Sequence, residues 1–351
     1  MTELLCIGNA IVDVFIDIDN KLALKYGILD TVQHIDREQA DSLLREPAID
    51  FSKAVRTSGG GAANVAKISA MLGMNAAFSG CTGNDELANL FKDEISGAGV
   101  SPVLVNSNEK TGICFACNID GINKLGETRF AASPGAALDL TEEHISDELI
   151  SSAELIVLDG YILDRRPLVQ HILLKASRRG IPVALDAASV FQVKRKAEEM
   201  LTYSRTFPLF LFMNADETLA FYNTIRKSRD EYINLSEKEK ETIILRDVGP
   251  MLKIITDGEL FPIVVVKLGG RGAIVYAGGN VYREETFTIT PRSTVGAGDA
   301  FCAAFTSAWI RGKSLSECAA LGNKVAREIL EVPGTYIKSG KLKNFAKVLQ
   351  K

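Results

Sequence analysis

The sequence predicts an α/β protein in which helices cover both faces of a mainly parallel central sheet. Short, continuous apolar runs recur along the chain, and helix-like stretches such as 166–179 and 197–203 lie between several of them. Apolar runs of this kind are typical of strands buried on both faces. The runs occupy residues 155–158, 182–185, 209–213 and 263–266. Ligands of such sheets bind beyond the carboxyl ends of the strands, so polar residues there are site candidates.

Two further regions predict a small second sheet beside the main body. Residues about 10–38 and about 104–131 are β-prone and alternate between apolar and polar positions, with a turn signal at Asp120-Gly121. We therefore expect a single domain over residues 1–351 that carries a small β lid made from these two segments. The charged stretch 226–246 predicts a solvated helical insertion.

The composition favours a globular enzyme that acts on small molecules. The 351 residues are 46% hydrophobic, and the formal net charge is −4. No cluster of Lys and Arg is interleaved with aromatic residues, so we expect no nucleic-acid partner and no membrane partner. The N-terminus has Glu3 where a signal peptide needs positive charge, and no apolar run approaches about 18 residues, so we expect a cytoplasmic location.

The six cysteines lie in apolar segments, which predicts reduced, buried thiols. Cys114 and Cys117 form a C-x-x-C pattern, but positions three apart in a strand face opposite sides of the sheet. No second pair accompanies them. We therefore expect a structural role for both thiols.

The strongest motif is the run from Gly296 to Asp299, which opens a helical pattern that continues through Trp309. Small residues at a helix start expose backbone N–H groups, and these groups with the helix dipole form an anion site. Asp299 lies in the same helix, so its carboxylate could accept a proton from an attacking hydroxyl. The alternative is that the glycines only shape a turn and that Asp299 interacts with the dipole.

Two glycine-containing motifs in the N-terminal part could bind a hydroxylated ligand. Gly60 and Gly61 open an apolar helix and allow a ligand close to the backbone, while Asn64 offers a donor and an acceptor. Asn9 and Asp13 follow the first strand, where an amide and a carboxylate can bind adjacent hydroxyls. A tight helix entry and a plain turn are the alternatives.

Two motifs in the C-terminal half are candidates for a nucleotide and its metal. Asn214 and Glu217 follow a predicted strand, where Glu217 could hold hydrated Mg²⁺, although a helix N-cap explains the same residues. Lys267, Gly269 and Gly272 form a glycine-rich turn after another strand, a weaker signal. The letters Gly312-Lys313-Ser314 resemble a phosphate-binding loop, but the required earlier glycine is missing.

Taken in this order, the motifs resemble the ribokinase/PfkB family of carbohydrate and nucleoside kinases. The resemblance rests on Gly60-Gly61 with Asn64, on Asn214-x-x-Glu217 and on Gly296-Ala297-Gly298-Asp299, and it spans essentially the whole chain. It implies a ribokinase-like three-layer α/β/α sandwich with a small β lid, the cofactors ATP and Mg²⁺, and phosphoryl transfer to an alcohol. In this reading Asp299 is the base, and residues 296–298 form the anion hole.

Within the family, the N-terminal third is similar to adenosine kinases. This similarity rests on the spacing Gly8-Asn9-x-x-x-Asp13, on the lid segment that ends at Gln33, and on the C-terminal run 314–336. The resemblance implies adenosine or a related nucleoside as acceptor; a sugar kinase of ribokinase or fructokinase type is the alternative, and a non-catalytic nucleoside- or sugar-binding regulator is a remote one. The implied substrate contacts are Asn9, Asp13, Gln33, Gly60, Gly61, Asn64 and Ile162. The implied ATP and Mg²⁺ contacts are Arg129, Asn214, Glu217, Lys267, Gly269, Gly272 and Asn323.

Three positions depart from the family pattern. Ser293 stands where an aspartate associated with a monovalent cation is usual, so the resemblance gives no basis for potassium activation. Lys267 stands where threonine is common. Ile162 lies in a run where adenosine kinases offer an aromatic side chain to the purine. Relatives pair through lid edges or stay monomeric, so a monomer or a homodimer is expected.

Overall fold

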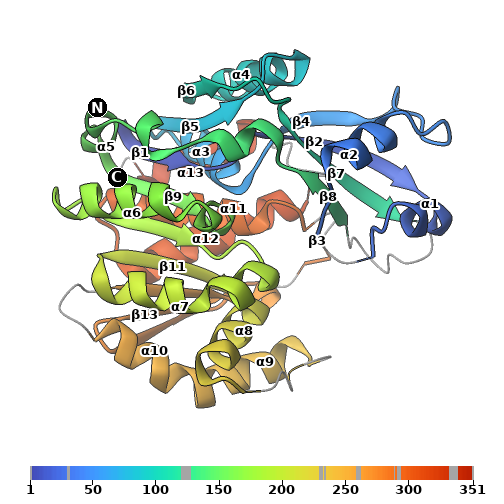
Figure 1. The fold of residues 1–351 in the computed structure, drawn as a ribbon. Coiled ribbons are helices and arrows are strands. Elements are labelled where there is room, and N and C mark those ends of the chain that lie inside the picture. The colour runs from blue at the N-terminus through green and yellow to red at the C-terminus, as the bar shows by residue number, and fades with distance from the viewer. Residues whose placement is uncertain are drawn as a thin grey trace.

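The main body of the protein is a large, twisted sheet with helices on both faces, and a smaller sheet projects from one end of it (Figure 1). The computed structural model describes residues 2–29, 32–119, 128–228, 232, 235–257, 262–287, 289–290, 294–331 and 339–349. Ser293 and the predicted turn at 120–121 lie outside the described residues.

The large sheet has nine strands in the order β14-β13-β12-β11-β10-β9-β1-β5-β6. The seven strands from β12 to β6 pair in parallel, and β13 and β14 add an antiparallel hairpin at one edge. This confirms the mainly parallel sheet. The strands are β1 Thr2–Ile7, β5 Ala76–Thr82, β6 Ser101–Asn106, β9 Ala153–Asp159, β10 Val183–Asp186, β11 Leu209–Asn214, β12 Ile263–Lys267, β13 Ala273–Ala277 and β14 Asn280–Glu284.

Two hydrophobic cores, one on each face of the large sheet, make the structure three-layered. Strand β1 shows the division, because Leu4 and Cys6 belong to one core and Leu5 and Ile7 to the other. The first core is covered by α3 Gly61–Met71, α4 Glu86–Gly97, α11 Ala297–Ile310, α12 Leu315–Leu330 and α13 Ser339–Leu349. The second is covered by α5 Asp147–Ser151, α6 Arg166–Ser177, α7 Val190–Thr206, α8 Ala215–Arg226 and α10 Gly249–Thr256.

The smaller sheet is the lid, and its strand order is β3-β8-β7-β2-β4. Strand β4 lies outside the two segments from which the sequence predicted the lid. Residues 104–106, in contrast, belong to β6 of the large sheet. The lid strands are β2 Ile11–Ile18, β3 Val32–His34, β4 Val55–Gly59, β7 Gly112–Ile119 and β8 Arg129–Ser133, and the helices beside them are α1 Asn20–Lys25 and α2 Arg37–Leu44.

The charged stretch is less solvated than its composition predicted. It contains α9 Glu237–Ile243 and a π-helical turn at Ile244–Val248. Glu241 is buried and forms ion pairs with Arg271 and Arg283. These ion pairs connect α9 to the hairpin that follows β12.

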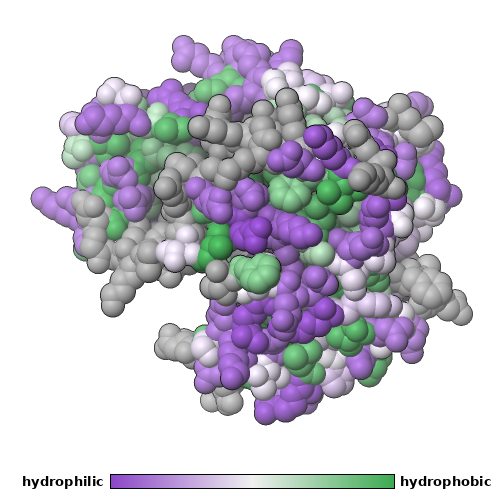
Figure 2. Space-filling model, turned by 180° about the vertical axis from the view of Figure 1, so that it is seen from behind, coloured by the Kyte–Doolittle hydropathy of each residue, from purple (hydrophilic) through white to green (hydrophobic). Residues whose placement is uncertain are grey.

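The remaining sequence features also have structural roles. All six cysteines are buried and none is disulfide-bonded, as predicted. Gly312 has a φ of 73°, and Ser314 caps α12 through a capping box with Glu317, so these phosphate-loop-like letters connect two helices. Among the described helices, none is long and apolar enough to cross a membrane. On the rear face, hydrophobic side chains form separate patches among hydrophilic ones (Figure 2).

Candidate active site

The candidate site begins at the carboxyl ends of neighbouring parallel strands. Asp159 at the end of β9 is the register partner of Asp186 at the end of β10, and Asn214 of β11 is the partner of Lys267 of β12. Because the strands run in the same direction, this register brings four polar side chains to one edge of the sheet. The last residues of β1 lead to Asn9 at the same edge.

The N-terminal turns of α3 and α11 meet above this edge. The Asn64 Nδ2 atom donates a hydrogen bond of 2.9 Å to Asp299 Oδ2, although the two residues are 235 positions apart. A Cβ atom on Gly61 would lie 3.5 Å from Asp299 Oδ1 and 3.4 Å from the Cβ atom of Asp159. These are ordinary van der Waals distances, and they place Gly61 between the side chains of Asp159 and Asp299.

Asp299 has the electrostatic environment of a general base. Burial and the neighbouring Asp186 raise its pKa to about 7, while the hydrogen bond from Asn64 and the charge of Lys267 oppose the rise. A base is most effective when its pKa lies near the working pH, because it is then largely deprotonated and still attracts a proton. The site thus holds Asp299 in the range that proton transfer from a hydroxyl requires.

The start of α11 is not capped by a side chain. Gly296 adopts the left-handed conformation there, with a φ of 78°. The backbone N–H groups of Gly298 and Asp299, in the first turn, have no carbonyl acceptor within the helix. A Cβ atom on Gly298 would lie 3.3 Å from Lys267 Nζ, so the ammonium group also lies at this helix end.

A cation beside the positive end of a helix needs nearby anions. Lys267 Nζ lies 2.6 Å from Asp186 Oδ2, and both side chains are largely buried. Burial opposes the charge on Lys267, but Asp186 and Glu217 outweigh it and raise the pKa of the ammonium group. Lys267 therefore stays charged, and its ammonium group is a fixed positive charge beside the start of α11.

Two of the predicted substrate contacts carry oxygen acceptors that accept no hydrogen bond from the described residues. Asn64 Oδ1 is buried and has no hydrogen-bond partner among the described residues. Within the same residues no hydrogen bond reaches the carboxylate of Asp13, whose exposed fraction is only 8%. Gly60 has a φ of 93°, and a Cβ atom there would lie 2.3 Å from the Asn9 carbonyl oxygen. This glycine therefore allows the start of α3 to pack closely against the backbone of Asn9.

The family of the chain is shown by the match of its sequence to a family profile. The profile of the pfkB family of carbohydrate kinases matches residues 20–341. The chain belongs to the pfkB family. As a pfkB-family kinase it is a phosphotransferase with an alcohol group as acceptor, and kinases of this family in general use ATP and Mg²⁺.

Relatives of this pfkB-family kinase act on two kinds of acceptor. The adenosine kinase of Schizophyllum commune is 25% identical over 350 residues, covering 96% of this chain and 97% of that protein. The 5-dehydro-2-deoxygluconokinase of Bacillus subtilis (strain 168) is 24% identical over 294 residues, covering 80% and 82%. The crystal structure of adenosine kinase from Sinorhizobium meliloti has a TM-score of 0.81 at 24% identity, covering 99% and 98%, which confirms the ribokinase-like fold.

Asn214 and Glu217 form the helix cap that the sequence offered as an alternative. Asn214 Oδ1 accepts from the Glu217 amide at 2.9 Å, and the Glu217 carboxylate accepts from the amide and the side chain of Asn214 at 2.8 Å each. Burial raises the pKa of Glu217 to about 7, with Asp186 adding to the effect and Lys267 opposing it. Each carboxylate oxygen keeps a lone pair for a water molecule.

This donor set fits a hydrated Mg²⁺. In the described part of the chain, no three His, Cys, Asp or Glu side chains converge as a metal cage. Mg²⁺ keeps several waters and takes further ligands from substrate phosphates, so it does not need such a cage. Glu217 would hold the ion through water, and Asn214 would orient Glu217.

The other residues predicted to line the ATP site come together around the hairpin after β12. Gly272 has a φ of 91°, and a Cβ atom there would lie 2.0 Å from the Glu284 carbonyl oxygen. Asn323 of α12 donates to the same carbonyl oxygen at 3.3 Å. Gly269 has a φ of 56° and begins the turn. These residues hold the shape of the hairpin, and their contact with a nucleotide stays a prediction.

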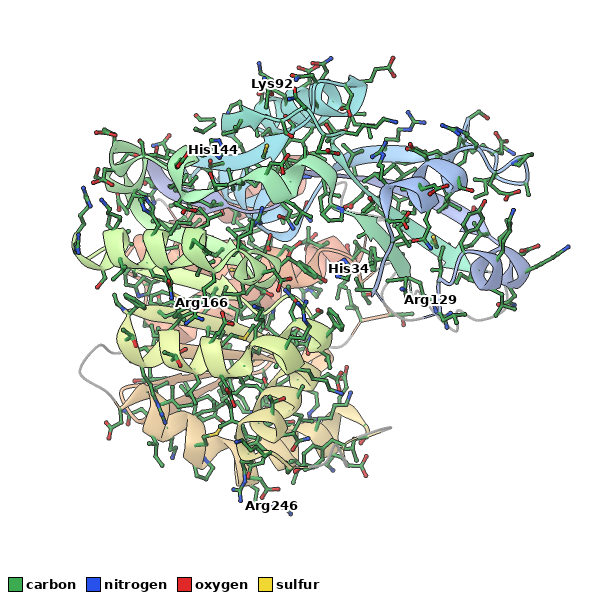
Figure 3. All side chains as sticks on the ribbon, viewed as in Figure 1. His34, Lys92, Arg129, His144, Arg166 and Arg246 are labelled. Atoms are coloured by element: carbon green, nitrogen blue, oxygen red, sulfur yellow. The ribbon has the colours of Figure 1, made fainter. Side chains whose placement is uncertain are left out.

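The two predicted lid residues lie on strands β8 and β3 of the smaller sheet. Arg129 donates from its guanidinium to the Ile28 carbonyl oxygen at 3.1 Å, and the Gln33 amide donates to the His34 carbonyl oxygen at 3.3 Å. Figure 3 shows His34 nearer the main body and Arg129 further out on the lid. In this structure both predicted residues therefore bond within the lid.

Ile162 is placed differently from what the resemblance implied. Its side chain is fully buried in the second core, so it has no surface to offer a purine. The adjacent Tyr161 is partly exposed, and its ring packs edge-to-face with His34 at a centroid distance of 6.1 Å. The ring of Phe191 lies 5.9 Å from His34. The aromatic surface near the lid is thus made by Tyr161, His34 and Phe191.

Three residues of the site, Asp159, Asp186 and Arg165, were not singled out by the sequence motifs. Asp159 accepts hydrogen bonds from the amides of Ala62 and Tyr161 at 3.4 and 3.1 Å, and burial raises its pKa. Arg165 donates to Asn9 Oδ1 at 2.6 Å and orients that amide. Asp159 ends an apolar run, which is a usable signal. Arg165 lies in a polar stretch that carries no such signal.

Proposed function

We propose that this chain transfers the γ-phosphoryl group of ATP to the 5′-hydroxyl of adenosine or of a closely related nucleoside. The observation that carries the proposal is the set of unpartnered acceptors beside the base. Asn64 Oδ1 is buried without a hydrogen-bond partner among the described residues, the Asp13 side chain belongs to a residue that is only 8% exposed, and Asn64 Nδ2 donates to Asp299. Adjacent hydroxyls of a ribose supply such donors, and their binding would direct a primary alcohol towards Asp299.

Each step of the reaction has a residue to support it. Asp299 would accept the proton of the attacking hydroxyl, since its pKa of about 7 suits that task. The amides at the start of α11 and the Lys267 ammonium would stabilise the charge of the transferred group. Mg²⁺, when bound near Glu217, would neutralise phosphate charge. Closure of the lid would exclude water from the site.

A nucleoside is favoured over a free sugar by the aromatic side chains at the lid. Tyr161, His34 and Phe191 belong to three different elements and form one cluster between the lid and the main body. Aromatic rings offer flat faces on which a planar nucleobase can stack. The similarity to an adenosine kinase over 96% of this chain agrees with this preference.

A free sugar is the second candidate acceptor. The match to 5-dehydro-2-deoxygluconokinase supports it. Arg165 supports it as well, because a guanidinium group at Asn9 suits an acceptor rich in carbonyl and hydroxyl oxygens.

A substrate panel measured by ADP production tests the proposal. The panel contains adenosine, inosine, cytidine, ribose, fructose and 5-dehydro-2-deoxygluconate, each with ATP and Mg²⁺, and the Asp299→Asn variant provides the blank. We expect the highest kcat/KM for adenosine. Turnover of a free sugar with no nucleoside phosphorylated would overturn the nucleoside assignment and retain the kinase.

A further inference from the structure

A lysine is buried in α3, one turn after Asn64. Lys67 is only 8% exposed, and the helix around it is otherwise apolar or small. Residues three positions apart share a helix face, so Lys67 lies on the same side as Asn64. A buried ammonium group is costly unless nearby groups compensate it, and burial lowers its pKa.

The groups that compensate Lys67 lie on the lid strand β4. The Lys67 ammonium donates to the Ser58 carbonyl oxygen, and it donates to Ser58 Oγ at 3.1 Å. Glu94 of α4 approaches the same strand, where its carboxylate accepts from Thr57 Oγ1 at 2.8 Å and from the Ser58 amide. Two opposite charges from different helices therefore meet on one short piece of the lid.

This piece of β4 lies directly beside Asp13. Thr57 is the register partner of Asp13 in the antiparallel pair of β4 and β2. A Cβ atom on Gly59 would lie 2.2 Å from Asp13 Oδ2, so the carboxylate fills the space that this glycine leaves. The packing fixes Asp13 against the strand that Lys67 and Glu94 hold.

The charged and titratable groups that face Asp13 come from three elements. Lys67 approaches from α3, Glu94 from α4 and the Cys114 thiol from β7. Burial raises the pKa of Asp13 to about 7, with Lys67 opposing the rise and Glu94 adding to it. The charges of Asp13, Glu94 and Asp299 all favour the charged form of Lys67 and oppose the effect of burial on its pKa.

We propose that Lys67 is a positioning residue of this kinase: it holds β4 through Ser58, and its charge favours the ionised form of the Asp13 carboxylate that packs against this strand, while the charge of Glu94 opposes that ionisation. Only the assignment of Asp13 to acceptor hydroxyls rests on the proposed function. An ionised carboxylate accepts two hydroxyl hydrogens, whereas a protonated one donates its own. Lys67 would thereby widen the pH range in which the acceptor binds.

An infrared titration of Asp13 tests the proposal without any substrate. The pH-dependent spectrum of the full-length protein, minus that of Asp13→Asn, isolates the carboxyl band of Asp13. We expect Lys67→Met to move its midpoint upward by about one pH unit or more, because a nearby opposite charge is removed. Glu94→Gln should move it downward, and Lys67→Arg should leave it near that of the wild type.

A matched control and a kinetic readout complete the test. Lys92 projects from the outer surface of α4 (Figure 3), so Lys92→Met should leave the midpoint unchanged. With adenosine as probe, the kcat/KM lost in Lys67→Met should be regained at high pH, where Asp13 ionises without help. A purely structural lysine would instead lower kcat/KM by the same factor at every pH.

The outcomes separate this inference from the proposed function. Midpoints that do not move in opposite directions in Lys67→Met and Glu94→Gln would overturn the role of Lys67, even with normal adenosine turnover. If Lys67→Met does not fold, two other midpoints test the role of Lys67. The Asp13 midpoint should move downward in Glu94→Gln and stay near the wild-type value in Lys67→Arg. If no nucleoside is phosphorylated, the proposed function fails, and the infrared midpoints still decide the inference.

Discussion

Replacement of Asp299 by asparagine removes the base and little else. Asparagine has nearly the same shape, and its Oδ1 atom can still accept from Asn64 Nδ2 at the position of the 2.9 Å hydrogen bond. General-base catalysis contributes about 10²- to 10⁴-fold. We therefore expect kcat to fall by at least about 10², which corresponds to about 3 kcal/mol of transition-state stabilisation.

The pH dependence of kcat provides a second, independent test of Asp299 as the base. Asp299 must be deprotonated to accept a proton, so activity rises with pH through its pKa of about 7. The deprotonated fraction is about 9% at pH 6 and about 91% at pH 8, so kcat should rise about tenfold over this interval. Asp299→Asn has no titrating group at this position, so its remaining kcat should not show the rise near pH 7.

ADP production at saturating acceptor, ATP and Mg²⁺ between pH 5.5 and 9 measures both effects. Saturation separates kcat from the binding of the acceptor, in which Asp13 titrates. Lys92→Met is the control for a surface change on the same fold. A kcat of Asp299→Asn within about threefold of the wild type, or a step near pH 7 that persists in the variant, would refute the assignment of Asp299 as base.

Two further predictions concern stability. Lys267→Met leaves the Asp186 carboxylate buried without its partner, so urea denaturation should show a loss of about 3 kcal/mol in unfolding free energy. Adding Asp186→Asn to this variant should restore part of the loss. If the losses of the two single variants simply add in the double variant, the ion pair is contradicted. The raised pKa of Asp299 contributes stability that is present below its ordinary value of 3.8 and is lost as pH rises through about 7. At pH 8 the Asp299→Asn variant should therefore be more stable than the wild type, by up to about 4 kcal/mol in unfolding free energy, and should melt at a higher temperature. This difference should vanish towards pH 4. Equal melting temperatures at pH 8 would show that burial of the Asp299 carboxylate does not destabilise the fold.

The sequence by itself determined the layered sheet and the helix starts of the site. Apolar runs and their turn residues are local features, so they predict strands and the polar residues at their ends without knowledge of the fold. The start of α11 could be placed in the same way, because Gly296 and Gly298 mark an uncapped helix entry. The roles of Asp299 and Asn64 then came from the resemblance to a family.

The tertiary structure decided which residues act together. Asn64 and Asp299 meet across 235 positions, and no local pattern records such a pairing. In the run after Asp159, register and core packing bury Ile162 and leave Tyr161 beside the lid. Lys67 resembles a solvated lysine in the sequence. Its role depends on the electrostatic field of Glu94 and Asp13, which three-dimensional packing creates and sequence spacing does not.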